Sequence, residues 1–322
     1  MQPRDCHTPA SGPGVKAARL AWAGICAGSM LALLQACVPA ATAPSAVSNT
    51  DPPEQAETFA PQEEPLASLP AQFEFGGELT QGGWIRGVVP ARTVSATFNG
   101  KPLALSPDGS FFAAFDRDAG PHAVLVATRE GGSTVRQDIS VSPRAWNIEH
   151  VNIAQRSGGP SAAFMRIREP ELARIAAARA VRSDTDGWRQ SFIWPAQGRI
   201  SGRFGSQRIY RGEAGSYHSG IDIATRESGT PFVAPADGVV VLASEQPFSL
   251  EGKLLIIDHG MGLNSAFLHC SELAVKEGER VSQGQYIGRI GMTGRATGPH
   301  LHWSMKWQDA RVDPILFTGP MR

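Results

Sequence analysis

The sequence predicts a mostly β protein, in which a small β-sandwich module and a linking helix precede a larger antiparallel β domain. Two observations predict this fold class. Short apolar or alternating runs, such as residues 94–98 and 253–258, recur between turn pairs such as Asn99-Gly100 and Gly131-Gly132. Helical periodicity, in contrast, is seen at residues 162–182.

Composition narrows the class of protein. The chain has 322 residues, a length that suits two domains plus appendages. Its 42% hydrophobic and 19% charged residues are typical of a folded globular protein. The formal net charge is zero and there is no basic stripe with interleaved aromatics, so we expect no nucleic-acid partner.

The first residues have the pattern of an export signal. Lys16 and Arg19 precede an apolar run over residues 20–36, and the run ends at Leu34-Gln-Ala-Cys37. This ending resembles the bacterial lipobox, whose cysteine is lipidated. We therefore expect residues 1–36 to be a lipoprotein-type signal peptide and Cys37 to carry the lipid.

Two alternatives remain for this segment: an ordinary signal peptide cut after Ala41-Thr-Ala43, or an uncleaved signal anchor. All three readings place the rest of the chain outside the cytoplasm. Lipidation would leave Cys270 as the single free cysteine, so no intramolecular disulfide could form. Cys270 follows His269 directly, but we expect a buried small side chain there rather than a nucleophile or metal ligand.

Composition shifts divide the rest of the chain. Residues 37–71 are rich in Pro, Ala, Ser, Thr and Glu, and are expected to be a disordered tether. Residues 72–145 are predicted to form the β-sandwich module, which carries no metal-ligand cluster and suits a spacer or protein contact. Residues 146–193 are predicted to be a linker with a helix, and residues 194–317 to be the antiparallel β domain.

The predicted helix has apolar residues at steps of three to five. Pro170 suits a first helical turn, so the firmest part of the helix is expected to begin there. We expect a connecting helix packed between domains. The apolar residues that recur at these steps are Phe164, Ile167, Leu172, Ile175 and Ala178.

Two short clusters in the last domain carry the chemistry. His218 and Asp222 alternate with Ile221 and Ile223, which predicts a strand with the two polar side chains on one face. The same period places His300 and His302 on one face of the run His300-Leu-His-Trp303. Imidazole and carboxylate groups suit a divalent metal such as zinc, so we expect a metal site between these strands.

The other histidines are weaker candidates. His269 lies on a strand-like run in the same domain. His259 lies in a turn, and His122 and His150 stand alone, so spacing gives none of these a role in chemistry.

Residues from about 196 to 317 resemble the lysostaphin/LytM-type zinc endopeptidases, which cut peptide cross-links in bacterial cell walls. The resemblance rests on Gly202-Arg-Phe-Gly205, His218-x-x-x-Asp222, Asp258-His-Gly260, His269, Gly291-x-Thr-Gly294, Thr297-Gly-Pro-His-Leu-His302 and Asp313-Pro314. The β-module and helix resemble, more loosely, the N-terminal part of envelope members of this family.

The resemblance implies roles for five residues. His218, Asp222 and His302 occupy the family's zinc-ligand positions, which implies one Zn²⁺ per chain. His269 and His300 occupy the positions of its two catalytic histidines. One of these would take the proton of the attacking water and the other would bind the oxyanion, and the sequence does not assign which does which.

The resemblance also implies a substrate and a location. We expect hydrolysis of peptidoglycan stem peptides at D-Ala–diaminopimelate bonds, although family members from other walls cut glycine bridges. The lipobox implies a periplasmic protein held by a lipid anchor in the outer membrane, since Val38 stands where Asp would signal inner-membrane retention. The β-module is a candidate contact for a cell-wall amidase or another envelope protein.

The alternative function is a non-catalytic regulator that binds and activates cell-wall amidases. Regulators of this type typically lack one or more of the five site residues, whereas all five are present here. Residues 207–216 are expected to form a flexible loop that could cover the site.

Overall fold

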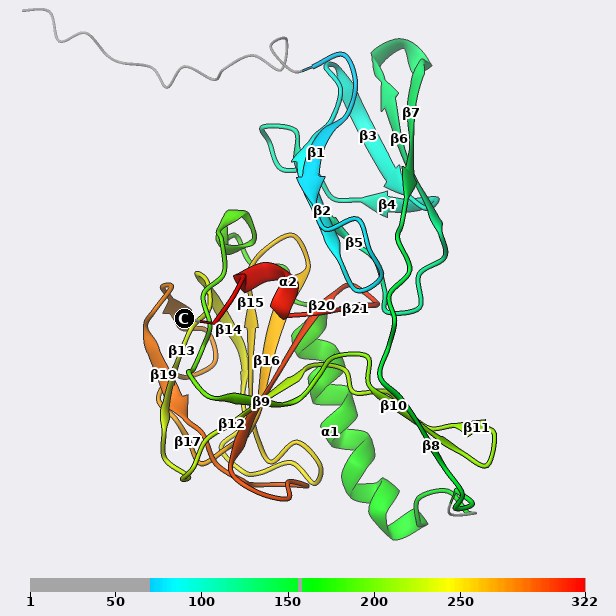
Figure 1. The fold of residues 1–322 in the computed structure, drawn as a ribbon. Coiled ribbons are helices and arrows are strands. Elements are labelled where there is room, and N and C mark those ends of the chain that lie inside the picture. Colours follow the sequence, from blue (N-terminus) through cyan, green and yellow to red (C-terminus); the bar gives the residue numbers. More distant parts are fainter. Residues whose placement is uncertain (1–69, 156–157, 322) are drawn as a thin grey trace, which may run out of the picture. The chain divides into compact units, whose positions relative to one another are not determined.

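The computed structural model describes residues 70–155 and 158–321 (Figure 1). The predicted signal peptide, Cys37 and nearly all of the tether lie outside these residues. The described chain belongs to one compact unit, Pro61–Arg322, so the predicted division into a module, a linker and a β domain stays a prediction. Among the described residues, no helix is long and apolar enough to cross a membrane.

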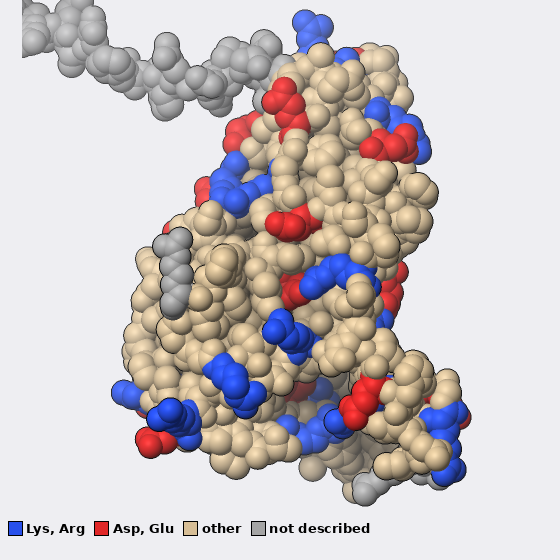
Figure 2. All heavy atoms as spheres, viewed as in Figure 1, with Lys and Arg blue, Asp and Glu red and all other residues tan. Residues whose placement is uncertain are grey.

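The fold is mostly β, as predicted, with antiparallel pairing in every sheet except one short parallel contact. On the face shown in Figure 2, basic and acidic side chains are interspersed, in keeping with the zero net charge of the full chain.

The first described residues form two antiparallel sheets. One has the order β1-β2-β5 and the other β4-β3-β6-β7. Asn99 and Gly100 both have positive φ, as the two-residue turn between β3 and β4 requires. The buried side chains of these sheets include Phe111, Phe112 and Leu125. The elements are β1 (Glu74–Gly77), β2 (Trp84–Val88), β3 (Thr93–Phe98), β4 (Lys101–Leu103), β5 (Ser110–Ala114), β6 (His122–Arg129), η2 (Glu130–Gly132) and β7 (Thr134–Ser140).

A larger sheet holds the candidate site residues. Its strand order is β18-β14-β15-β16-β20-β12-β9, and β21 pairs with β20. The strands are β9 (Arg199–Gly202), β12 (Ile221–Ala224), β14 (Gly238–Ala243), β15 (Lys253–Asp258), β16 (Leu263–Cys270), β18 (Arg280–Val281), β20 (His300–Trp307) and β21 (Ala310–Val312).

A three-stranded sheet packs against the larger sheet. Its order is β13-β19-β17, with bounds β13 (Pro231–Val233), β17 (Glu272–Leu273) and β19 (Tyr286–Arg289). Phe232 from β13 packs on Phe267, which stacks on Trp303. All three rings are fully buried, so one face of β16 and β20 packs into the core, and on β20 the opposite face carries His300 and His302. The short elements η3 (Gly187–Arg189) and α2 (Ile315–Thr318) complete the fold.

The helix α1 (Ala162–Ala180) is regular from its first residue, whereas Pro170 had been expected to lie in its first turn. The Ser161 hydroxyl accepts a hydrogen bond from the Phe164 amide and caps the helix, so Pro170 lies inside it. Of the apolar residues that gave the helical pattern, Ala178 is buried, whereas Ile167 and Leu172 are exposed.

Charge pairs explain why α1 holds its position with so few apolar contacts. Arg168 is buried and donates two hydrogen bonds of 2.6 Å to the Glu251 carboxylate. Glu171 accepts from the Ser249 amide at 2.6 Å. At the other end, Ala178 packs against Ala266 and neighbouring apolar residues of β14 and β15. The helix is therefore fastened to the face of the sheet opposite the main core (Figure 1).

Residues 207–216 do not form the free loop that was expected. They form β10 (Gln207–Tyr210) and β11 (Glu213–Ala214), which pair as a hairpin. β10 also pairs in parallel with β8 (Ile148–Val151). Arg211 and Gly212 at the turn both have positive φ, so the reversal is a tight turn whose pairing was not visible in the sequence.

His259 is a buried structural histidine, and it predicts a pH dependence of stability. Its Nδ1 donates to the Asp237 carbonyl at 2.7 Å and its Nε2 accepts from the Ser265 hydroxyl at 2.8 Å. Burial lowers the pKa of His259 from 6.5 to about 4. The unfolded chain binds this proton first, so the stabilisation is full above about pH 6.5 and about 3 kcal/mol is lost as pH falls toward 4.

We expect His259→Asn to remove this part of the pH dependence. Urea unfolding between pH 4.5 and 7 should show a slope smaller than that of the wild type by about 1.4 kcal/mol per pH unit. His122→Asn, at an exposed position, is the matched control. Equal slopes in wild type and His259→Asn would contradict this assignment.

Candidate active site

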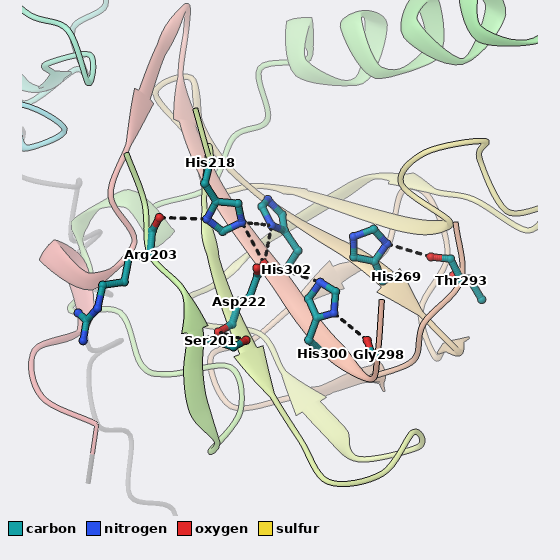
Figure 3. A network of polar contacts seen from close by, with 9 residues as sticks. All are labelled: Ser201, Arg203, His218, Asp222, His269, Thr293, Gly298, His300 and His302. Carbon is teal, nitrogen blue, oxygen red and sulfur yellow. Dashed lines mark hydrogen bonds and ion pairs between the residues drawn. The ribbon is translucent and has the colours of Figure 1, made fainter. Parts of the chain in front are cut away.

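Three side chains converge on one oxygen atom. The Nε2 atom of His218 lies 3.1 Å from Oδ1 of Asp222, and Nδ1 of His302 lies 2.9 Å from the same oxygen. The two imidazole nitrogens are 3.1 Å apart. The convergence follows from strand pairing, because Asp222 on β12 is directly opposite His302 on β20 (Figure 3).

His218 reaches the cluster from a loop and not from a strand. β12 begins at Ile221, so the prediction that His218 and Asp222 share one strand face is wrong. The chain bends at Gly220, where a Cβ atom would lie 2.4 Å from the Trp303 carbonyl oxygen. Glycine therefore allows a close approach to β20 that a regular strand would not make.

His269 and His300 lie beside the cluster. Their ring centroids are 4.9 Å apart, and Nε2 of His300 lies 3.7 Å from Oδ1 of Asp222. His300 and His302 share one face of β20, as predicted, while Leu301 and Trp303 point into the core. The structure thus brings together all five residues expected at the site (Figure 3).

Backbone carbonyls fix the protonation pattern of three of these rings. In each, Nδ1 lies within hydrogen-bond distance of a carbonyl oxygen, which can only accept, so the proton of the neutral ring is on Nδ1. Nε2 of His269 and of His300 therefore presents a lone pair to the site, whereas Nε2 of His218 faces Asp222 and donates to it when the ring is protonated. The pairs are His218 with Arg203 at 3.1 Å, His269 with Thr293 at 2.9 Å and His300 with Gly298 at 2.8 Å.

The cluster sets its own charge state. Burial opposes ionisation of Asp222, but hydrogen bonds from His218 and His302 outweigh it and bring the pKa of the carboxyl well below its usual range. Burial likewise acts to lower the pKa of His218, and the contact with Asp222 reverses the shift and raises it. Burial lowers the pKa of His302 and of His269, which favours their neutral forms.

The donor set fits a divalent zinc ion. Among the described residues, His218, Asp222 and His302 form a group whose ligand atoms all lie within 4.8 Å of one another. Tetrahedral zinc with donors at about 2.0–2.1 Å places two donors about 3.3 Å apart. The three contacts of 2.9–3.1 Å approach that edge length, and two nitrogens with one carboxylate oxygen are ligands that zinc accepts.

Cys270 takes no part in this group. It is fully buried, and burial raises the pKa of its thiol, so it stays protonated. The prediction of a small buried side chain is confirmed. Sequence reasoning missed the carbonyls of Arg203, Thr293 and Gly298, although the glycine-rich runs in which Thr293 and Gly298 lie were visible.

This antiparallel β domain carries a His/Asp/His group on one face of its sheet, and comparison with known proteins identifies its class. Residues 216–314 match the model of Peptidase family M23. These residues therefore constitute a peptidase family M23 domain, and the predicted resemblance to the lysostaphin/LytM type is confirmed.

Three similar proteins give the range of the match. "Peptidoglycan DD-endopeptidase ShyA" of Vibrio cholerae is 41% identical over 124 residues, which cover 38% of this chain and 28% of that relative. "Lipoprotein NlpD/LppB homolog" of Pseudomonas aeruginosa is 37% identical over 131 residues, which cover 41% of this chain and 39% of that relative. The chain thus matches less than half the length of either curated relative.

The third is a crystal structure of a putative peptidase M23 from Pseudomonas aeruginosa. It is 29% identical, with a TM-score of 0.58, and the match covers 76% of this chain and 96% of that chain. This match extends well beyond the M23 domain into the residues before it.

Gly202 predicts how sensitive the cluster is to crowding. A Cβ atom at Gly202 would lie 2.2 Å from Oδ2 of Asp222 and 2.9 Å from Cε1 of His218, so Gly202→Ala must displace the carboxylate. We expect a loss of zinc affinity of about 10- to 100-fold, measured by competition with a zinc-chelating dye. Gly76→Ala, where nothing lies within 4 Å, is the control. Unchanged affinity in Gly202→Ala would refute the assigned donor set.

Proposed function

We propose that this chain is a zinc-dependent endopeptidase that hydrolyses peptide cross-links of bacterial peptidoglycan, at D-Ala–diaminopimelate bonds. The observation that carries the proposal is the complete five-residue constellation: a His/Asp/His donor set with two further histidines beside it. The 41% identity to a protein named as a peptidoglycan DD-endopeptidase supports the choice of substrate.

Charge and protonation state assign different roles to the site residues. His218, Asp222 and His302 would hold one zinc ion. When bound, zinc supplies a Lewis acid that polarises the scissile carbonyl and brings the pKa of water toward 7. The carbonyls behind His218, His269 and His300 hold the rings in the tautomer that offers Nε2 to the site.

His269 and His300 would then move the proton. Burial lowers the pKa of His269, which keeps the ring neutral and favours it as acceptor of the proton from the attacking water. The same ring, once protonated, can deliver that proton to the leaving amine. Nε2 of His300 lies 3.7 Å from Oδ1 of Asp222, so this ring would lie beside the scissile carbonyl and would donate to the developing oxyanion when Nε2 carries a proton.

A non-catalytic regulator of cell-wall amidases is the second candidate. The observation that favours it is the 37% identity to a relative named as an NlpD/LppB lipoprotein homolog. The intact donor set favours the enzyme, because a binding module needs neither three converging ligands nor two adjacent bases. The β-module before the domain would be the contact for an amidase or another envelope protein under either proposal.

Location also belongs to this proposal. Two observations support export to the periplasm with a lipid anchor in the outer membrane. One is the similarity to a protein named as a lipoprotein, and the other is the lipobox-like run Leu34-Gln-Ala-Cys37. Incorporation of a labelled fatty acid into wild type but not Cys37→Ala would test the anchor.

Two substitutions test the assigned roles. His302→Ala should lose both zinc and activity, because it removes a ligand. His300→Ala should keep zinc and lose activity by about 10²- to 10⁴-fold, because it removes a group that acts on the substrate. The measurements are zinc content of the purified protein and release of products from cross-linked peptidoglycan, resolved by mass.

His150→Ala, at an exposed position, is the control and should change neither quantity. Full activity in either site variant would overturn the roles. A wild type without zinc and without cleavage, but able to activate an amidase, would establish the regulator instead.

A further inference from the structure

The free face of β20 continues beyond the histidines. Side chains alternate along a strand, and Met305 and Trp307 point into the core, so Lys306 lies on the same face as His302. Four residues of strand separate their Cα atoms by about 13 Å. Lys306 is directly opposite Asn264 on β16 and Arg311 on β21.

A third cation approaches from the helix. The Arg179 guanidinium, near the end of α1, donates to Oδ1 of Asn264 at 3.2 Å. Arg179 and Lys306 are half-buried and Arg311 is exposed, so solvent reaches this point of the face. Residues far apart in sequence thus bring three positive side chains to one row across β16, β20 and β21.

Two carboxylates lie nearby and offset the cations in part. Oδ2 of Asp116 accepts a hydrogen bond from the Arg311 amide, and Asp309 lies 3.8 Å from Lys101. Within the described residues, neither carboxylate forms a direct ion pair with any of the three cations, although both act to raise the pKa of Lys306. Arg311 contacts the Tyr217 hydroxyl at 3.2 Å, which leaves its charge in place.

The cations destabilise one another. Burial, and after it the charge of Arg311, lowers the pKa of Arg179 to about 10. Burial and then the charge of Arg179 lower the pKa of Lys306. Asp116 and Asp309 oppose the shift at Lys306 and Glu251 opposes the shift at Arg179, but the net pKa of each stays lowered. Like charges that are only partly compensated cost folding energy, and such arrangements concentrate where a protein binds an ion of opposite sign.

We propose that Arg179, Lys306 and Arg311 form a subsite that binds a free carboxylate of the substrate peptide. This inference rests on the proposed function. An extended peptide lying along β20 with its scissile carbonyl at the histidine cluster would place a group three or four residues away at Lys306. Ionised groups of negative sign on a peptide are carboxylates, and the planar guanidinium of Arg311 suits them.

The test uses cross-linked muropeptide dimers in two forms, with free carboxyl groups and with the same groups amidated. Wild type should have a KM about tenfold lower for the free form. Lys306→Gln and Arg311→Gln should lose most of this difference, while kcat and zinc content stay near wild-type values. Lys276→Gln, an exposed lysine outside the cluster, should discriminate as wild type does.

The thermal unfolding midpoint of each variant shows whether a loss of discrimination comes from unfolding. Removing one of three repelling cations should leave the Tm of Lys306→Gln unchanged or raise it. Arg311→Gln, at an exposed position, provides a second variant if Lys306→Gln folds poorly. Equal discrimination by wild type and both variants would overturn the subsite.

Failure of the proposed function is distinguishable from failure of the subsite. If wild type cleaves neither form, the enzyme proposal fails and titration calorimetry with the two dimers tests the subsite alone. Tighter binding of the free form by wild type, absent in Lys306→Gln, supports the subsite. Equal binding of both forms, or no binding, refutes it.

Discussion

The convergence of His218, Asp222 and His302 on one oxygen atom is the constraint on which the rest of the site depends. Three polar atoms about 3 Å apart require β12, β20 and the loop before β12 to approach one another closely. Glycine on the neighbouring β9 leaves room for them, because a Cβ at Gly202 would strike the carboxylate of Asp222. Hydrogen bonds from His218 and His302 to Asp222 hold the group together, and a divalent metal ion would take the place of their protons.

The two flanking histidines depend on a second set of contacts. His269, the residue before the last of β16, has a φ of 65°, a conformation that costs energy for a residue with a side chain. Its amide donates to the Glu251 carbonyl at 2.8 Å, and Arg168 on α1 holds the Glu251 carboxylate. Thr293 completes the frame, since its carbonyl accepts from His269 and its hydroxyl donates to the Cys270 carbonyl at 2.8 Å. The helix therefore supports the geometry of the site without touching it.

Part of this could be predicted from the sequence, and the limits have physical reasons. The period of a strand was enough to put His300 and His302 on one face, because it acts between neighbours in the chain. It failed for His218, which reaches Asp222 through a bend at Gly220. Residues 207–216 looked like a loop because their partner, β8, is some 60 residues away. Ile167 and Leu172 follow the helical period but are exposed, because ion pairs rather than apolar contacts orient this part of α1.

The proposed subsite of Arg179, Lys306 and Arg311 could not be predicted from the sequence for a similar reason. Arg179 comes from a helix, Lys306 from a central strand and Arg311 from the strand that pairs with it, so register alone brings them together. A sheet whose core face is filled by Phe267 and Trp303 has its other face for substrate where α1 does not cover it. On that face, the histidines and the Asp222 carboxylate lie at one end of β20 and the three cations at the other. A face polarised in this way fixes the direction of a bound peptide, since a reversed peptide would place its carboxylate against Asp222.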